Sequence, residues 1–79
     1  MDKNEILVRV NEIFKKELDN EDIKLDFEST AKDVEEWDSL SHVQLIVAIE
    51  KSFKIRFASR EIQSWQNVGQ MVETIFKKL

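Results

Sequence analysis

The sequence has no cysteine and no proline, and only one of its 79 residues is glycine. Without cysteine there is neither a disulfide framework nor a thiolate metal site, so any thiol chemistry has to be supplied by a bound group. Proline and glycine are the main breakers of helices and formers of tight turns, and their scarcity favours a helical domain. A chain this short has material for one core, which predicts a single domain over residues 1–79.

Long apolar stretches are missing as well, and none approaches the ~18 residues that a membrane-spanning helix needs. Residues 1–5 lack the pattern of a secretory signal or a transit peptide, so we expect a cytoplasmic protein. Sixteen acidic residues against twelve basic ones give a net charge of -4. Because this charge repels phosphate backbones and anionic lipids, we expect neither nucleic acid nor a membrane surface as a partner.

An amphipathic helix is predicted near the start of the chain, from about Asn4 to Leu18. Asp2 and Glu5 precede and open it as a capping pair, in which each side chain bonds the other residue's backbone N–H. The apolar residues recur at helical spacing on one face, which consists of Ile6, Leu7, Val10, Ile13, Phe14 and Leu18.

Two more helices are predicted in the last third of the chain. A short one runs from Ser59, as its cap, through Ser64, with Ile62 pointing inward. The last helix begins after a capping pair formed by Asn67 and Gln70. Its apolar face consists of Val68, Met71, Val72, Ile75, Phe76 and Leu79.

The helical period is lost from residue 19 to residue 37. Ile23, Leu25 and Phe27 alternate there with charged residues, but the stretch is too short for a stable isolated strand. We therefore interpret these three side chains as anchors that hold a long loop across the helices, and a loop of this length is often functional. Residues 30–34 are compatible with one helical turn.

The most apolar helix is predicted to begin at Asp38 or Ser39 and to end at about Phe53. At 100° per residue its core stripe consists of Val43, Ile46, Ile49 and Phe53. The opposite face is half apolar, which is typical of an intermittent contact surface, and consists of Leu40, Gln44, Val47, Ala48 and Lys51. Together the elements predict an all-α fold: a small four-helix bundle of three main helices and one short one, with a long first loop.

Ser39 has three competing interpretations. The simplest is a helix cap, the usual role of serine at the start of an apolar helix. The second is a hydrolase nucleophile with His42 as its base, but there is no glycine-rich elbow and no evident oxyanion hole. The third is a modification site, because an anion attached there would lie at a helix N-terminus, where free backbone amides favour negative charge.

The residues around Ser39 resemble those of the acyl carrier protein family. The resemblance begins with the motif Asp38-Ser39-Leu40 and continues through Val43, the apolar run Leu45 to Ile49, Glu50 and Phe53. Apolar residues at Phe57, Ile62 and Val68 also fall at the family's positions. An Asp-Ser-Leu tripeptide alone is a weak signal of the family. The same tripeptide at this position along the sequence, in a chain with this length and helix order, is a specific one.

The resemblance implies that Ser39 receives phosphopantetheine from coenzyme A through a phosphopantetheinyl transferase. The thiol of that group then holds an acyl intermediate as a thioester, and the protein itself is not an enzyme and needs no metal. Asp38 matches the acidic residue that the transferase recognises, and His42 matches a position near the root of the arm. The exposed helix face, at Leu40, Gln44, Val47, Ala48 and Lys51, becomes the surface for acyl-activating and acyl-transferring enzymes.

The sequence departs from fatty-acid carriers on this helix. Where those carriers present several carboxylates, this chain has Ser41, Gln44, Lys51 and Ser52, and only Glu50 is acidic. Charge complementarity governs such encounters, so we expect a specialised stand-alone monomeric carrier that serves a dedicated lipid or secondary-metabolite pathway. Two alternatives remain open: an aminoacyl or peptidyl carrier of the same superfamily, and a non-carrier acidic helical adaptor in which Ser39 is only a cap.

Overall fold

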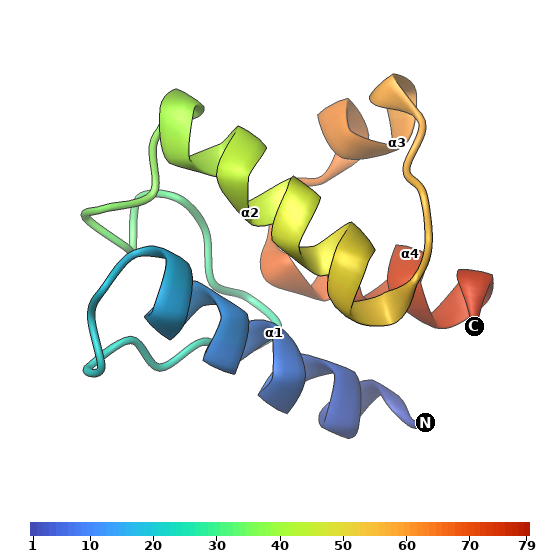
Figure 1. Ribbon diagram of the computed structural model, residues 1–79, viewed down its shortest axis with the longest axis horizontal. Coiled ribbons are helices and arrows are strands. Elements are labelled where there is room, and N and C mark those ends of the chain that lie inside the picture. Colours follow the sequence, from blue (N-terminus) through green and yellow to red (C-terminus); the bar gives the residue numbers. More distant parts are fainter.

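Four α-helices and the segments that join them make up residues 1–79 of the computed structural model, and no strand is present (Figure 1). In chain order the helices are α1 (Lys3–Glu17), α2 (Ser39–Phe53), α3 (Ser59–Ser64) and α4 (Val68–Lys78). α1 packs against both α2 and α4, and the short α3 connects α2 to α4. The predicted all-α bundle with a long first loop is therefore confirmed. None of the helices combines the length and the apolar character needed to cross a membrane.

The first helix forms as its sequence predicts. The carboxylate of Asp2 accepts a 2.9 Å hydrogen bond from the backbone N–H of Glu5, whose own carboxylate accepts from the backbone N–H of Asp2 at 3.1 Å. Ile6, Val10 and Phe14 are fully buried, and the other apolar residues of this face pack against the core in partly buried positions. Burial of this face holds α1 against its two neighbouring helices.

The buried face of α2 differs from the predicted one at two positions. Ile46, Ile49 and Phe53 are buried as expected, but Leu45 joins them, whereas the side chain of Val43 is 64% exposed. With 3.6 residues per turn, Val43 lies about 100° around the helix from the middle of the buried stripe. The prediction of Val43 as a core residue is wrong because the helix presents Leu45 to the core instead.

The long first loop is held by a side chain of α1. The Asn11 side chain accepts a 2.6 Å hydrogen bond from the backbone N–H of Leu25 and donates one of 3.2 Å to the carbonyl oxygen of Ile23. Ile23 and Leu25 are buried, which confirms their role as anchors, while Phe27 is only partly covered. Asn11 thus satisfies backbone groups that a neighbouring strand would satisfy in a sheet.

Residues 30–34 form a hydrogen-bonded turn and not a helix. The backbone N–H of Asp33 donates to the carbonyl oxygen of Thr30 at 2.9 Å, and the Asp33 carboxylate accepts from the Thr30 N–H at 2.9 Å. Val34, which follows the turn, is buried in the core. The turn therefore directs the chain towards the start of α2.

The last two helices begin close to the predicted residues. The N-cap of α3 is Ala58 and not Ser59, and the Ala58 N–H is satisfied by the Glu61 carboxylate at 2.7 Å. Asn67 caps α4 as predicted, accepting from the Gln70 N–H at 2.9 Å.

The apolar face of α4 is buried only in part. Val68, Met71, Val72 and Ile75 lie in the core, whereas Phe76 and Leu79 are 42% and 55% exposed. These two residues were predicted to share the apolar face, but Phe76 lies about 90° around the helix from the middle of the buried stripe, and Leu79 follows the last helical residue. The Lys3 ammonium lies 5.3 Å from the centre of the Phe76 ring.

The two chain ends lie on the same side of the molecule, away from the first turn of α2 (Figure 1). The start of α2 therefore stands at one end of the bundle, beside the end of the long loop, and it is there that the predicted site residues occur.

Candidate functional site

Asp38 caps α2. Its carboxylate accepts hydrogen bonds from the backbone N–H groups of Leu40 at 3.0 Å and Ser41 at 2.9 Å. The Ser41 hydroxyl in turn accepts from the Asp38 N–H at 2.8 Å, which completes a reciprocal capping box. The bond from the Ser41 N–H is the main reason that the pKa of the Asp38 carboxyl lies below its usual value. Asp38 is therefore ionised at neutral pH and fixed in place.

Ser39 is left without a capping role. It is the first residue of α2, its side chain is exposed, and its hydroxyl takes part in no side-chain hydrogen bond of the protein. The interpretation of Ser39 as the helix cap is wrong because the neighbouring carboxylate already occupies that position. A hydroxyl that is exposed, unbonded and fixed on the first turn of a helix is accessible to a modifying enzyme.

Three of the amide groups at the start of α2 are not free to bind an anion, contrary to the expectation from sequence. The N–H groups of Leu40 and Ser41 are bonded to Asp38, and the N–H of His42 donates to the Asp38 carbonyl oxygen at 2.9 Å. A negatively charged group on Ser39 would also lie next to the Asp38 carboxylate. We therefore expect such a group to extend into solvent and not to fold back onto the helix end.

His42 is committed to a different partner. Its Nδ1 accepts a 2.9 Å hydrogen bond from the indole N–H of Trp37, and no hydrogen bond joins it to Ser39. Partial burial lowers the pKa of His42, so the imidazole is neutral at pH 7. With Nδ1 as acceptor, the proton of the neutral ring is assigned to Nε2. The nucleophile-and-base arrangement that hydrolysis requires is absent.

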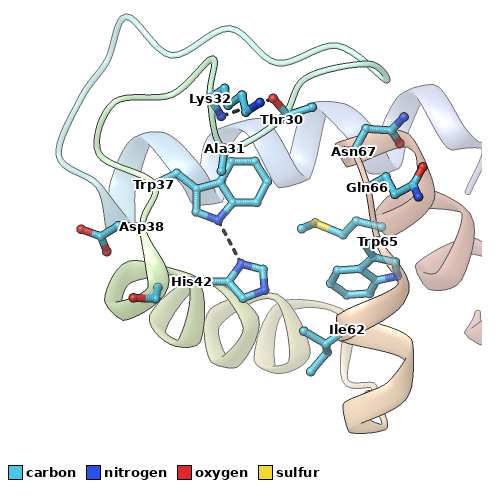
Figure 2. A pocket seen from close by; sticks show the side chains of 12 residues that line it. Thr30, Ala31, Lys32, Trp37, Asp38, His42, Ile62, Trp65, Gln66 and Asn67 are labelled. Atoms are coloured by element: carbon cyan, nitrogen blue, oxygen red, sulfur yellow. Dashed lines mark hydrogen bonds between the residues drawn. The ribbon is translucent and has the colours of Figure 1, made fainter.

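A cavity of about 650 Å³ opens next to Ser39, between the end of the loop, α2 and the segment around α3 (Figure 2). Figure 2 shows Trp37 and Trp65 on opposite sides of it, with His42 on the α2 side and Asp38 pointing away. Its lining consists of Thr30, Ala31, Lys32, Trp37, Asp38, Ser39, His42, Ile62, Trp65, Gln66, Asn67 and Met71.

Only some of the residues that line this cavity could be identified from the sequence. His42, which was predicted to lie near the root of the arm, lines the cavity together with Ser39, whereas neither Trp37 nor Trp65 was predicted to belong to the site. Trp37 both packs in the protein and lines the cavity: its ring lies 4.9 Å from that of Phe14, centre to centre, while another part of its surface faces the cavity. The two indoles are far apart in the sequence, so no local pattern indicates that they face each other.

The predicted outer face of α2 is exposed. Leu40 is 83% exposed, Val47 is exposed to a lesser extent, and a shallow groove runs along Leu40, Gln44, Val47, Ala48 and Lys51. Val43, released from the core, extends the same apolar surface. The one carboxylate of α2, that of Glu50, accepts a 2.8 Å hydrogen bond from the Phe57 N–H. The groove along this face therefore contains no carboxylate from α2.

Two comparisons with known proteins match this arrangement. Residues 8–75 match the model of a family described as the phosphopantetheine attachment site. The fold is similar to the solution structure of a holo acyl carrier protein from Geobacter metallireducens, with a TM-score of 0.87 and 41% sequence identity. That similarity covers 92% of this chain and 84% of the other.

Proposed function

The chain belongs to the acyl carrier protein family, whose prosthetic group is phosphopantetheine, and from this premise we propose that Ser39 is the attachment residue. The protein is a carrier and not an enzyme. When bound, the phosphopantetheine group supplies a thiol that holds an acyl group as a thioester and presents it to partner enzymes. This chain, which has no cysteine, supplies the position of that group and the surface that the enzymes contact.

The single observation that supports Ser39 most strongly is its free hydroxyl beside a capped helix end. Asp38 takes over the capping, so the Ser39 hydroxyl can be modified without loss of any hydrogen bond of the fold. The cavity next to Ser39 gives the attached group an apolar surface to contact. We also propose that Asp38, ionised and exposed, is recognised by the phosphopantetheinyl transferase.

The experiment is incubation of the folded protein with coenzyme A and a promiscuous phosphopantetheinyl transferase, followed by intact mass measurement. We expect a gain of one phosphopantetheinyl group on the wild type and on Ser52→Ala, and no gain on Ser39→Ala. Ser52 is a matched control because it is also an exposed serine of α2 without a side-chain hydrogen bond. An unmodified wild type, or a modified Ser39→Ala variant, would show that Ser39 is not the attachment residue.

We propose that the α2 outer face, defined as Leu40, Gln44, Val47, Ala48 and Lys51, is the docking surface for the transferase and for acyl-activating and acyl-transferring enzymes. Its apolar residues are next to the attachment point, and Glu50 is bonded to the Phe57 N–H. Leu40 and Val47 would then supply the apolar contacts, while Lys51 and Glu17, which also lines the groove, would contribute charge. The substitution Val47→Lys should raise the KM of the transferase for the carrier, whereas Ser52→Lys should leave it nearly unchanged.

The lack of available carboxylates on α2 also supports a specialised carrier over one of general fatty-acid synthesis. We propose a monomeric domain over residues 1–79 that acts in the cytoplasm, where coenzyme A and acyl-handling enzymes meet. Efficient support of a reconstituted fatty-acid synthesis system would contradict the specialised role. Sedimentation of the modified protein as a dimer would contradict the monomer.

A further inference from the structure

The cavity beside Ser39 has a flat wall made of two rings. The indole of Trp37 and the imidazole of His42 are inclined by only 20°, their centres are 5.9 Å apart, and an N–H···N bond of 2.9 Å joins their edges. Rings that are nearly parallel and joined edge to edge form one continuous surface and not a stacked pair. The wall extends from the end of the loop onto α2 (Figure 2).

The opposite side of the cavity is also aromatic and also fixed. The indole N–H of Trp65 donates to the Thr74 hydroxyl at 2.9 Å, and its ring meets Phe57 edge to face with centres 5.0 Å apart. Because the N–H groups of both Trp37 and Trp65 are already bonded within the protein, neither indole offers a hydrogen-bond donor to a bound group. The two rings therefore contribute carbon surface held in a defined orientation.

One of the hydrogen-bond donors in the lining belongs to the aromatic wall itself. His42 uses Nδ1 as acceptor, and its Nε2–H has no partner within the protein. Ile62 and Met71 complete the apolar part of the lining. The lining therefore combines flat aromatic surfaces with polar groups, of which the His42 donor belongs to the aromatic wall itself, whereas an unbranched saturated chain would use only the apolar area.

The cavity beside Ser39 has enough volume for an aromatic ring. Benzene binds in a protein cavity of about 150 Å³, so about 650 Å³ holds an aromatic ring together with the adjoining end of the arm. We propose that this cavity binds an aromatic acyl group, placed against the Trp37–His42 wall and opposite Trp65, with His42 Nε2–H donating to an oxygen of that group. The inference rests on the proposed attachment at Ser39.

The test uses protein loaded directly from benzoyl-coenzyme A or hexanoyl-coenzyme A by the promiscuous transferase. The loaded mass of each sample is checked first, so failure to load identifies a failure of the attachment proposal and not of this one. The hydroxylamine cleavage rate of each thioester is then compared with that of the same acyl group on free pantetheine. We expect protection to be at least about threefold greater for benzoyl than for hexanoyl, the size of one aromatic contact.

Nuclear Overhauser contacts give a second, direct measurement. We expect contacts from the benzoyl ring protons to both indoles, and slower solvent exchange of His42 Nε2–H in the benzoyl form than in the form without an acyl group. Trp65→Leu should remove the extra protection, whereas Phe76→Leu, an exposed aromatic outside the cavity, should retain it. A loaded benzoyl group without contacts to either indole, or hexanoyl protected equally well, would overturn the proposal.

Discussion

The backbone N–H of Gly69 donates a 2.7 Å hydrogen bond to the carbonyl oxygen of Phe27, and a Cβ atom at Gly69 would lie 2.6 Å from that same oxygen. The N–H of Val68 likewise donates to the Ser29 carbonyl oxygen at 2.8 Å. The first amides of a helix have no partner within the helix, and here the long loop supplies their acceptors. The only glycine of the chain is thus required by the close approach of the loop to α4.

We predict that Gly69→Ala destabilises the fold. The added methyl group would collide with a backbone oxygen that cannot rotate away, and such overpacking costs about 1–3 kcal/mol. This exceeds the ~1 kcal/mol that alanine gains over glycine within a helix. Urea unfolding at equilibrium measures the difference, with the exposed Lys77→Ala as a control on the same helix. Equal or greater stability of Gly69→Ala would show that the loop moves away without cost.

Removal of the Asn11 side chain should loosen the long loop. In Asn11→Ala the Leu25 N–H and the Ile23 carbonyl oxygen lose their partner, and each unsatisfied buried group costs about 1–3 kcal/mol. A domain of this size has a total stability of about 3–5 kcal/mol, so the variant should be partly unfolded at 37 °C.

Amide hydrogen exchange of Leu25 locates the effect of this substitution, because its protection should fall more than that of α4 amides. Asn4→Ala is the matched control, since Asn4 is an exposed asparagine of the same helix without a side-chain hydrogen bond. Unchanged protection of Leu25 would rule out the bracing role of Asn11.

The substitution Asp38→Asn tests the capping role of Asp38 separately from its proposed recognition by the transferase. Asparagine is as good an N-cap as aspartate, so Asp38→Asn should keep the helix content and the melting temperature close to wild type. If the transferase uses the charge, its kcat/KM should fall about tenfold or more, the factor that ~1.4 kcal/mol represents. Circular dichroism and the mass-based loading assay measure the two effects. Wild-type loading by Asp38→Asn would assign the residue to capping alone.

Stability should decrease as the pH falls from 7 towards 5. Burial lowers the pKa of His42 in the folded state, so the unfolded chain binds this proton more readily. The contribution of neutral His42 to the free energy of unfolding is fully present above the ordinary histidine pKa of about 6.5, and it is lost as the pH falls through the lowered pKa of the folded state. Protonation at Nδ1 also removes the acceptor of the Trp37 N–H.

The pH window separates this effect from that of the carboxylates. Asp38, Glu61 and Glu73 also have lowered pKa values, so their contributions are lost only at a more acidic pH. Urea unfolding from pH 8 to pH 5 should show a slope in the wild type that is reduced in His42→Gln. The same slope in both proteins would assign the pH dependence to another group.

The helices and their caps were predictable because they depend on residues close together in the sequence. Asp2 and Glu5 bond each other in both directions as expected. Asn67 accepts from the Gln70 N–H as expected, but the Gln70 side chain accepts from the Gln66 N–H and not from that of Asn67. The exchange of Val43 for Leu45 in the core was not predictable from periodicity alone. Both lie on apolar stretches of α2, and the direction in which the helix packs against α1 and the rest of the core decides which of the two is buried.

Two features depend on contacts between segments that are distant in the sequence: the hydrogen bonds between Asn11 and the long loop, and the positions of the two indoles that line the cavity. Asn11 is a polar residue of the first helix, and nothing near it in the sequence indicates that Leu25 will be its partner. Trp37 and Trp65 line the same cavity only because the loop, α2 and the segment after α3 fold next to one another. The alternation of Ile23, Leu25 and Phe27 predicted loop anchors, correctly for Ile23 and Leu25, but it did not indicate that an amide side chain would bond the backbone there.

The position of the chain ends has a practical consequence for measurements. Both ends lie away from the first turn of α2, so a tag or a surface linkage at either end leaves the proposed attachment point facing the bulk solution. A sensor chip coated through the N-terminus would present every molecule with its arm outward. Transfer of cargo between carrier and enzyme can then be followed on immobilised protein without the support blocking the approach of the enzyme.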